Sequence, residues 1–406
     1  MIVLKNGFIN IDNALVARDV AIENDKIVAI GSDLDATSAE VIDVKGGYIT
    51  AGAVDVHVHL REPGFTKKET VASGTKSAAS GGVTTIMAMP NTMPATDSVV
   101  HLSTINEIIE RDAVVKVYPF CSVTKGLKGA ELTDMAHIAP TVKGFSDDGV
   151  CVNDGTLLKD AMAIAKAYNK VIASHLECEG YGTTPEAEIL ACKKELVLAK
   201  ETGVKYHLCH LSTTQCVSML KEAVANGVDV TAEVTPHHLF LTEEEIVSPN
   251  FKMNPPLRSN KDREAVLNAL LDGSITIVAT DHAPHTEEEK SREYNLCPNG
   301  IIGLETLFPL IYTNLVRTGK ATLNQMEAWL TTNPAERFGL PSGKVAVGAT
   351  ADIAVLDINN SRIYNKNNIV SSGKNSPFIG AELYGFAVLT LVDGKVVYNN
   401  LHGGLR

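Results

Sequence analysis

The chain has 406 residues, of which 45% are hydrophobic and 21% charged, as is ordinary for a globular protein. Its net charge of −12 argues against a surface for nucleic acid or an anionic membrane, so a small anionic substrate would need a local positive site, which metal ions could supply. The seven cysteines are scattered without a C-x-x-C pair, which indicates a reduced, cytoplasmic protein. The N-terminus lacks the apolar stretch of a signal peptide, and no apolar run reaches the ~20 residues of a membrane span.

The first 50 residues are expected to be rich in β-strands. Short apolar runs alternate there with Asn-Gly, Asn-Asp and Gly-Ser turn signals. The runs are Ile2–Leu4, Val20–Ile22, Ile27–Ile30 and Val41–Val44.

Strand-like and helix-like stretches alternate through residues 51–341. The expected strands are Tyr48–Leu60, Val83–Pro90, Val115–Thr124, Val142–Ser146, Val171–His175, Tyr206–Leu211, Val228–Val234 and Ile275–Thr280. The expected helices are Lys67–Ser80, Val99–Arg111, Leu132–Ile138, Leu157–Tyr168, Glu186–Glu201, Asp262–Leu271 and Leu304–Val316. Eight strands in this alternation predict an α/β protein with a TIM-like (β/α)8 barrel. The alternative is an open doubly wound sheet, which would more typically bind a nucleotide at a Gly-rich first turn that this chain lacks.

Residues 343–406 return to the pattern of the N-terminus, with GKVAVGATADIAVLDI and a hairpin turn at Asp393-Gly394. We therefore expect a small β-sandwich domain built from both chain ends, residues 1–50 with 342–406, beside a barrel of residues 51–341. Two unrelated tails are the alternative, but both ends carry enough apolar alternation to need a partner sheet.

The segment Asp55-Val-His57-Val-His59 ends the first expected barrel strand. Its period of two puts His57 and His59 on one strand face, so both imidazoles can reach one metal ion. An isolated pair of this kind is more often packing than a ligand set. Its place at a C-terminal strand end, where such barrels carry their active sites, favours a metal site.

Other strand ends carry further metal-binding residue types. His175 and His210 each follow a later strand, and a lone histidine there is more often a core residue than a ligand. With the first pair, however, they form a 2 + 1 + 1 set. Asp281 follows the eighth strand, where it could bind metal and move a proton, the alternative being a helix cap. With Asp148 after the fourth strand, four His and two Asp at one rim predict a two-metal hydrolytic centre.

Six motifs carry a resemblance to a known family. They are HVHLREPG (57–64), MPNT (89–92), FSDDGV (145–150), CHLS (209–212), NPPLR (254–258) and ATDHAPH (279–285). As a set they resemble dihydroorotase of the class I, monofunctional bacterial type, a branch of the cyclic amidohydrolase superfamily. The resemblance extends over essentially the whole chain, including GKVAVGATADIAVLD of the small β domain.

The resemblance implies two zinc ions per subunit. It implies His57, His59 and Asp281 as ligands of the first zinc, His175 and His210 as ligands of the second, and Asp148 as the carboxylate shared by both. Many relatives bridge the zincs with a carboxylated lysine instead, and Lys143 is the alternative here. The Asp-Asp-Gly pattern favours Asp148.

The resemblance also implies the substrate contacts. Arg61 and Asn91 would hold the substrate carboxylate, for which a guanidinium offers a planar fork. Two departures bear on closure over the substrate: the stretch after His175 is shorter than in the relatives, and Asn299 stands where they tend to carry an aromatic residue. Further contacts are implied for Asn254, His285 and the backbone of Asn299 and Gly300, whereas His237 and His238 match no ligand position and are expected to be structural.

The activity implied is the reversible cyclisation of N-carbamoyl-L-aspartate to (S)-dihydroorotate, the third step of pyrimidine synthesis in the family, with Asp281 moving the proton. One alternative is a hydantoinase, dihydropyrimidinase or allantoinase, whose substrates lack the ring carboxylate and would leave Arg61 unexplained. Another is a catalytically dead scaffold, which would be expected to lose ligands. The resemblance implies a cytoplasmic homodimer and leaves open an association with another enzyme of the pathway.

Overall fold

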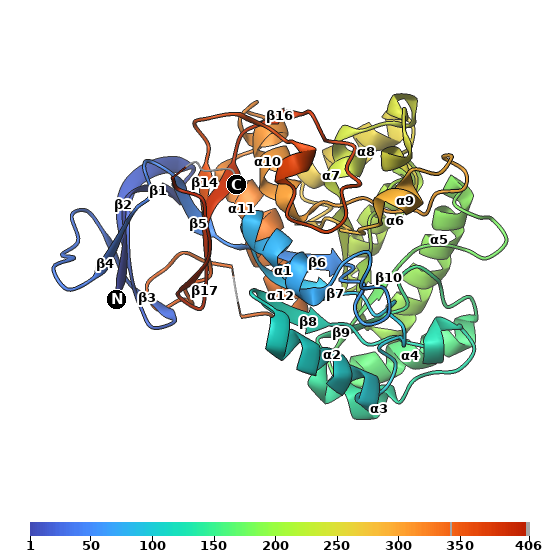
Figure 1. Cartoon of the computed structure of the whole chain (residues 1–406). Coiled ribbons are helices and arrows are strands. Elements are labelled where there is room, and N and C mark those ends of the chain that lie inside the picture. Colours follow the sequence, from blue (N-terminus) through green and yellow to red (C-terminus); the bar gives the residue numbers. More distant parts are fainter. Residues whose placement is uncertain (342, 403–406) are drawn as a thin grey trace.

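Both ends of the chain build one sheet at one side of the molecule, in a computed structural model that describes residues 1–341 and 343–402 (Figure 1). The strand order is β18-β17-β14-β5-β1-β2-β3, and β4 pairs with β1. Thr50 of β5 faces Ala354 of β14, so two unrelated tails are excluded. The strands are β1 (Ile2–Ile11), β2 (Ala14–Glu23), β3 (Lys26–Gly31), β4 (Glu40–Asp43), β5 (Tyr48–Ala51), β14 (Ile353–Asp357), β17 (Phe386–Val392) and β18 (Lys395–Asn399).

The predicted boundary at residue 342 and the final residues 403–406 lie outside the described residues. The division into residues 1–50 with 342–406 and residues 51–341 therefore stays a prediction.

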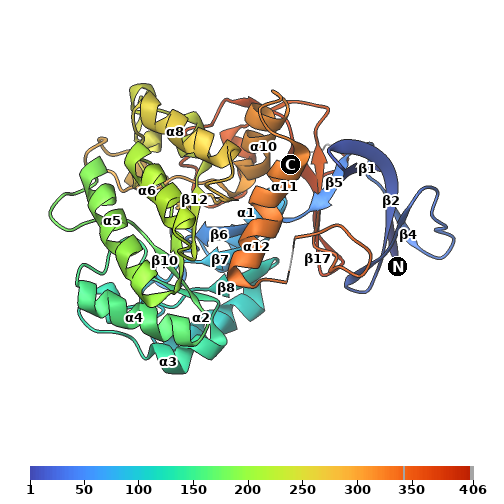
Figure 2. The ribbon, with the colours of Figure 1, turned by 180° about the vertical axis from the view of Figure 1, so that it is seen from behind.

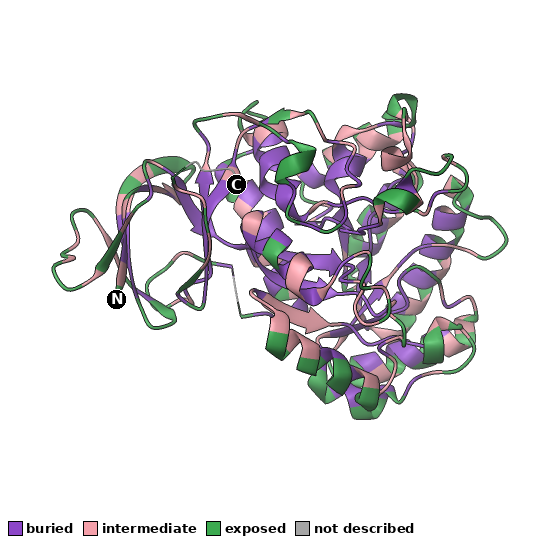
Figure 3. Ribbon diagram, viewed as in Figure 1, coloured by how far each residue is buried: buried purple, intermediate pink, exposed green. Residues whose placement is uncertain are grey.

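The other large unit is the predicted parallel barrel. Its strands form two parallel runs, β6-β7-β8 and β9-β10-β11-β12-β13. Single parallel bridges, Cys121 to Phe145 and Val58 to His282, join the two runs into a ring. The strands are β6 (Ala53–Val58), β7 (Val83–Ala88), β8 (Lys116–Pro119), β9 (Gly144–Ser146), β10 (Val171–Ser174), β11 (Lys205–Leu208), β12 (Val230–Val234) and β13 (Ile277–Val278). Every residue of β6 and β7 is buried, as is typical of parallel strands covered on both faces, whereas β8, pink in Figure 3, is only partly buried.

The predicted strand Tyr48–Leu60 is in fact two strands that belong to different sheets. β5 lies in the small sheet and β6 is the first barrel strand, and the chain passes between them at Gly52. A Cβ atom on Gly52 would lie 2.1 Å from the side chain of Thr84, so only glycine fits this close approach. Apolar residues continue through the junction, which is why the sequence pattern did not show the break.

Helices cover the outside of the barrel. Seen from behind, α4, α5 and α6 follow one another along its wall (Figure 2). No sequence pattern singled out α6, although Thr213 provides a typical N-cap by accepting a hydrogen bond from the Cys216 amide. The helices are α1 (Val71–Ser80), α2 (Val99–Asp112), α3 (Met135–Ile138), α4 (Gly155–Ala167), α5 (Pro185–Thr202), α6 (Thr214–Ala225), α7 (Pro236–Phe240), α8 (Asn260–Leu271), α9 (Glu287–Lys290), α10 (Leu307–Ile311), α11 (Leu323–Glu327) and α12 (Asn333–Phe338). In the described ranges, no helix is long and apolar enough to cross a membrane.

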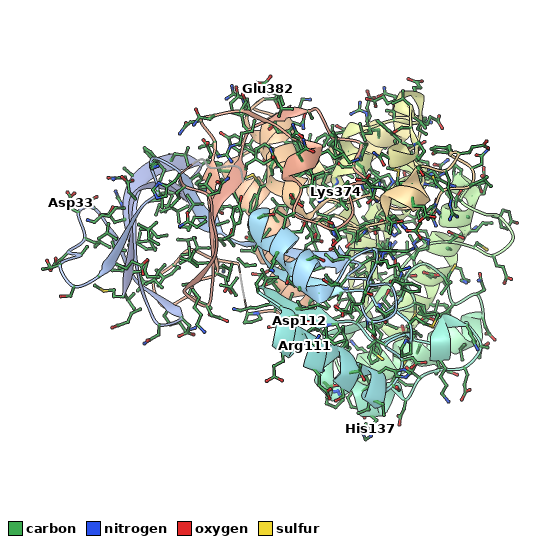
Figure 4. All side chains as sticks on the ribbon, viewed as in Figure 1. Asp33, Arg111, Asp112, His137, Lys374 and Glu382 are labelled. Atoms are coloured by element: carbon green, nitrogen blue, oxygen red, sulfur yellow. The ribbon has the colours of Figure 1, made fainter. Side chains whose placement is uncertain are left out.

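Between β14 and β17 the chain leaves the small sheet and crosses to the rim of the barrel. Lys374, labelled in Figure 4, lies on this segment, and its Nζ donates to the carbonyl of Ile369 at 2.7 Å. The buried Asn375 donates through Nδ2 to the carbonyls of Ala283 and Gly300, at 3.1 and 3.0 Å. The C-terminal part of the chain therefore helps to hold loops at the C-terminal ends of the barrel strands.

Candidate metal centre and substrate cavity

The end of β6 and the turn after β13 bring three predicted ligands together. His59 Nε2 lies 3.0 Å from Asp281 Oδ1, and His57 Nε2 lies 3.6 Å from the same oxygen. Asp281 has a φ of 49°, a left-handed backbone conformation uncommon outside glycine, asparagine and aspartate. These residues form one candidate metal-binding group.

A second group comes from the ends of β9, β10 and β11. His175 Nδ1 lies 3.0 Å from His210 Nε2. Asp148 Oδ1 lies 3.7 Å from His175 Nδ1 and 3.8 Å from His210 Nε2. Three possible ligand atoms from three neighbouring strands thus converge on one point.

Asp148 lies between the two groups. Its Oδ1 faces the second group and also lies 3.3 Å from His57 Nε2, whereas its Oδ2 lies 3.4 Å from His59 Nε2. One carboxylate therefore presents an oxygen to each side, as a bridging ligand must. The neighbouring Asp147 instead accepts hydrogen bonds from the Val123 and Thr124 amides.

Lys143, the alternative bridge, lies away from this site. It precedes β9, at the opposite end of the strand from Asp148. Its Nζ donates to the carbonyl of Gly339 at 2.8 Å and lies 5.5 Å from the centre of the Tyr118 ring. The alternative of a carboxylated Lys143 is therefore contradicted by the geometry.

The hydrogen bonds of three histidines direct the other nitrogen of each ring towards the candidate metal site. Carboxylate and amide oxygens only accept, so His57 Nδ1 donates to Glu233 at 2.6 Å and His59 Nδ1 to Asn91 at 2.9 Å. His175 Nε2 likewise donates to Glu177 at 3.1 Å. Each ring then offers the lone pair of its other nitrogen, which is how metal-binding histidines are usually oriented.

The electrostatics of the cluster also favour a cation. Burial opposes the protonation of His57, but Glu233, Asp148 and Asp281 outweigh it and raise its pKa well above the usual value. Burial would raise the pKa of Asp148, but His57 and His210 hold it well below its usual range. In the described part of the chain, His57 Nε2 and Asp148 Oδ1 are buried without a hydrogen-bond partner. A metal ion would provide a partner for both atoms and would balance the negative charge of the surrounding carboxylates.

Glu233 is a functional residue that the sequence analysis missed. It lies fully buried in β12, where it also accepts from His207 Nε2 at 3.0 Å and from the His210 amide at 3.3 Å. It thus orients His57 and the backbone of His210. The sequence contains a signal for such a role, because Glu233 is the one charged residue within the otherwise uncharged strand Val230–Val234. The sulfur of the buried Cys209 lies within 4.8 Å of possible ligand atoms of His57 and Glu233.

We expect Glu233→Gln to weaken zinc binding by roughly 10- to 100-fold, because an amide oxygen holds the imidazole less strongly than a carboxylate does. Zinc retention during titration with a chelator measures this. Glu195→Gln is the matched control, since Glu195 is equally buried but bonds Ser174 and Tyr206 instead of a predicted ligand. Equal zinc retention in the two variants would show that Glu233 does not support the metal site.

A cavity of about 200 Å³ opens onto both candidate groups. Besides predicted metal ligands, its wall includes most of the predicted substrate contacts, namely Arg61, Asn91, Asn254, Asn299 and Gly300. Asn254 Nδ2 donates to Glu177 at 2.7 Å, so the carboxylate that holds His175 also holds Asn254. Glu177 was not predicted, and its position two residues after His175 was the only signal.

His285 lies next to Arg61 but is not among the residues that line the cavity. Its Nε2 donates to the Asn299 carbonyl at 2.7 Å and lies 3.3 Å from Arg61 Nη2. Burial and the charges of Arg61 and Lys68 lower the pKa of His285 to about 3, so the ring is neutral. In this geometry His285 holds the Asn299 loop and packs against Arg61.

His237 and His238 belong to neither candidate group. His238 is held by Thr235 Oγ1 at 2.7 Å and by the Pro255 carbonyl at 3.0 Å, which agrees with a structural role. Burial lowers the pKa of His237 to about 3. A neutral, packed ring fits the structural role expected for it.

Comparison with known proteins assigns this arrangement to a family. The sequence profile of the amidohydrolase family matches residues 48–397. The fold agrees: the L-hydantoinase (dihydropyrimidinase) from Arthrobacter aurescens is 25% identical, with a TM-score of 0.90 over 100% of this chain and 97% of that one. The dihydropyrimidinase from Brevibacillus agri NCHU1002 is 26% identical, with a TM-score of 0.88 over 98% and 95%. The chain belongs to the amidohydrolase family.

Within that family, the chain is similar to curated dihydroorotases. That of Geobacillus sp. (strain WCH70) is 46% identical over 420 residues, covering 98% of both chains. That of Brevibacillus brevis is 42% identical over 424 residues, covering 98% of this chain and 100% of the other. The resemblance seen in the motifs is therefore confirmed, and the chain is a dihydroorotase-type hydrolase of cyclic amides.

Proposed function

We propose that the protein is a zinc-dependent dihydroorotase that interconverts N-carbamoyl-L-aspartate and (S)-dihydroorotate, the third step of pyrimidine synthesis. The observation that supports this choice of substrate is the position of Arg61. Its partly buried guanidinium lines the cavity and donates to the Pro284 carbonyl at 3.2 Å. Over the described ranges it forms no ion pair with a carboxylate of the protein, so its charge is available to a carboxylate of the substrate.

The residues of the site divide the work as follows. His57, His59 and Asp281 would hold one zinc and His175 and His210 the other, with Asp148 shared. Bound zinc supplies Lewis acidity at the amide carbonyl and lowers the pKa of water towards ~7.

Proton movement falls to Asp281. Burial would raise the pKa of Asp281, but His57 and His59 lower it, so it is ionised and able to accept a proton. In hydrolysis it accepts the proton of the attacking water and returns it to the leaving ring nitrogen. In the reverse direction, ring closure removes one carboxylate and consumes a proton, so lower pH favours dihydroorotate.

The competing function is that of a hydantoinase or dihydropyrimidinase, which the names of the structural neighbours favour. Purified enzyme should be assayed side by side with dihydroorotate, hydantoin and dihydrouracil, and in reverse with carbamoyl aspartate. We expect turnover of dihydroorotate to exceed the others. Preference for a ring without a carboxylate would overturn the proposal. Inactivity on all rings, without bound metal, would favour a non-catalytic scaffold.

We expect Arg61→Lys to lower kcat/KM for dihydroorotate by at least roughly thirtyfold, about 2 kcal/mol of transition-state binding. A lysine keeps the charge but cannot make the two-pronged contact with a carboxylate. Steady-state kinetics measure the loss, and Lys68→Arg, which alters the cation beside His285 without touching the cavity wall, is the control. Unchanged efficiency in Arg61→Lys would revive the hydantoinase function.

We also propose that the protein acts in the cytoplasm as a homodimer, alone or with another enzyme of the pathway. The seven cysteines are free, which supports a reducing compartment. Light scattering during size-exclusion chromatography tests the dimer.

A further inference from the structure

Lys290, the last residue of α9, buries its ammonium group behind the substrate cavity. Only 7% of the residue is exposed. Its Nζ donates to three backbone carbonyls, those of Lys252 at 3.2 Å, Pro298 at 3.1 Å and Gly300 at 3.0 Å. An ammonium group has three N–H bonds, so all of them serve the backbone. No carboxylate lies within 4.0 Å of it in residues 1–341 and 343–402. Burying a charge without a counter-charge costs free energy, which here only the three carbonyls offset.

Two of the three carbonyls that Lys290 holds, those of Pro298 and Gly300, belong to the loop that closes one side of the cavity. Asn299 and Gly300 line the cavity, whereas Lys290 lines a separate hollow of about 240 Å³ on the other side of the loop. The loop thus lies between the cavity and the ammonium group of Lys290.

This arrangement determines where the amides of the loop point. The peptide between Pro298 and Asn299 is trans, so its N–H is directed opposite to its carbonyl. Because the Pro298 carbonyl points to Lys290, the Asn299 N–H is directed away from Lys290, and Asn299 lines the cavity. This N–H has no backbone or side-chain acceptor in the described structure, whereas the Gly300 N–H already donates to the Lys252 carbonyl at 2.9 Å. Asn299 is therefore the residue of this pair with a free donor.

Other contacts of the loop are consistent with a fixed geometry. Asn375 shares the Gly300 carbonyl with Lys290. Gly300 has a φ of 132°, and a Cβ there would lie 2.7 Å from the Ala283 carbonyl, so no other residue fits without strain. His285 holds the Asn299 carbonyl from the side of Arg61. Each carbonyl of residues 298–300 is thus turned to a protein donor.

We infer that Lys290 is a positioning residue for substrate binding: it holds the carbonyls of Pro298 and Gly300 so that the Asn299 N–H is presented as a hydrogen-bond donor to an oxygen of the anionic substrate. The identity of that substrate rests on the proposed function. Since the loop lines the cavity and supplies no candidate metal ligand, we expect its loss to affect binding more than chemistry.

The test compares Lys290→Met with Lys290→Arg and with Lys366→Met. Lys366 lines the same hollow but pairs with Glu287 at 2.9 Å and does not touch the loop. For Lys290→Met we expect KM for dihydroorotate to rise at least about tenfold, kcat to stay within about twofold, and zinc content to stay unchanged. Lys290→Arg, which keeps the charge and donors, should recover part of the KM. Lys366→Met should resemble the wild type.

Hydrogen exchange of the free protein provides a readout that does not depend on turnover. Amides in the peptide that contains residues 298–301 should exchange faster in Lys290→Met than in the wild type or Lys366→Met. Unchanged exchange, or faster exchange with unchanged KM, would overturn the inference. A joint fall of kcat, zinc content and Tm would reduce Lys290 to a structural residue and overturn it as well. If the wild type does not turn over dihydroorotate, the proposed function fails separately, and exchange together with KM for the ring that is turned over still tests Lys290.

Discussion

Asp281→Asn should retain zinc while kcat falls by roughly two to four decades in both directions of the reaction. An amide still offers an oxygen to the metal, and the two histidine neighbours of Asp281, His57 and His59, remain in place. What the amide cannot do is accept the proton of water. Elemental analysis and steady-state kinetics on the same preparation separate the two roles, and the acidic limb of the hydrolytic pH–rate profile should change.

His282→Ala is a suitable control for this experiment. The neighbouring ring bonds Glu69 at 3.4 Å and the Gly303 amide at 3.2 Å, on the other side of the turn from the candidate metal site. The His282→Ala variant should therefore keep its zinc. Near-wild-type turnover of Asp281→Asn with zinc bound would assign the proton transfer to another group.

Asp148→Ala should lose at least one zinc and most activity, because each of its oxygens faces a different candidate group. Lys143→Ala should keep both zincs, since Lys143 is held by Gly339 at the other end of β9. Zinc is counted in both variants after purification without chelator, with and without added bicarbonate. Loss of zinc in Lys143→Ala, or its restoration by bicarbonate, would contradict an aspartate bridge.

The parts of the site that could be predicted are those set by local geometry. Period-two alternation placed His57 and His59 on one face, and the rule that parallel strands end at one rim brought His175, His210 and Asp281 towards them. These inferences need only short stretches of sequence. The structure brings together the residues that they selected.

What could not be predicted depends on contacts between distant parts of the chain. His57 and Glu233 are separated by 176 residues, and their hydrogen bond follows from the strand order of the closed barrel. Asn375 reaches Gly300 only because the chain leaves the small sheet after β14. The split at Gly52 depends on which strand each half pairs with. The pattern of apolar residues indicates which strands are buried, but it does not indicate which strand each of them pairs with.

The pairing of β5 with β14 gives the molecule a particular order of assembly. Residues about 300 positions apart must meet before the small sheet is complete, and contacts of such high sequence separation are slow to form. During synthesis the ribosome releases all six predicted ligands, from His57 to Asp281, well before β14, Asn375 and β17. The predicted ligands are therefore synthesised before Asn375, whose side chain tethers Gly300 next to Asn299. Capacity to bind metal would be acquired before a finished substrate site, and the last stretch of the chain would complete the enzyme.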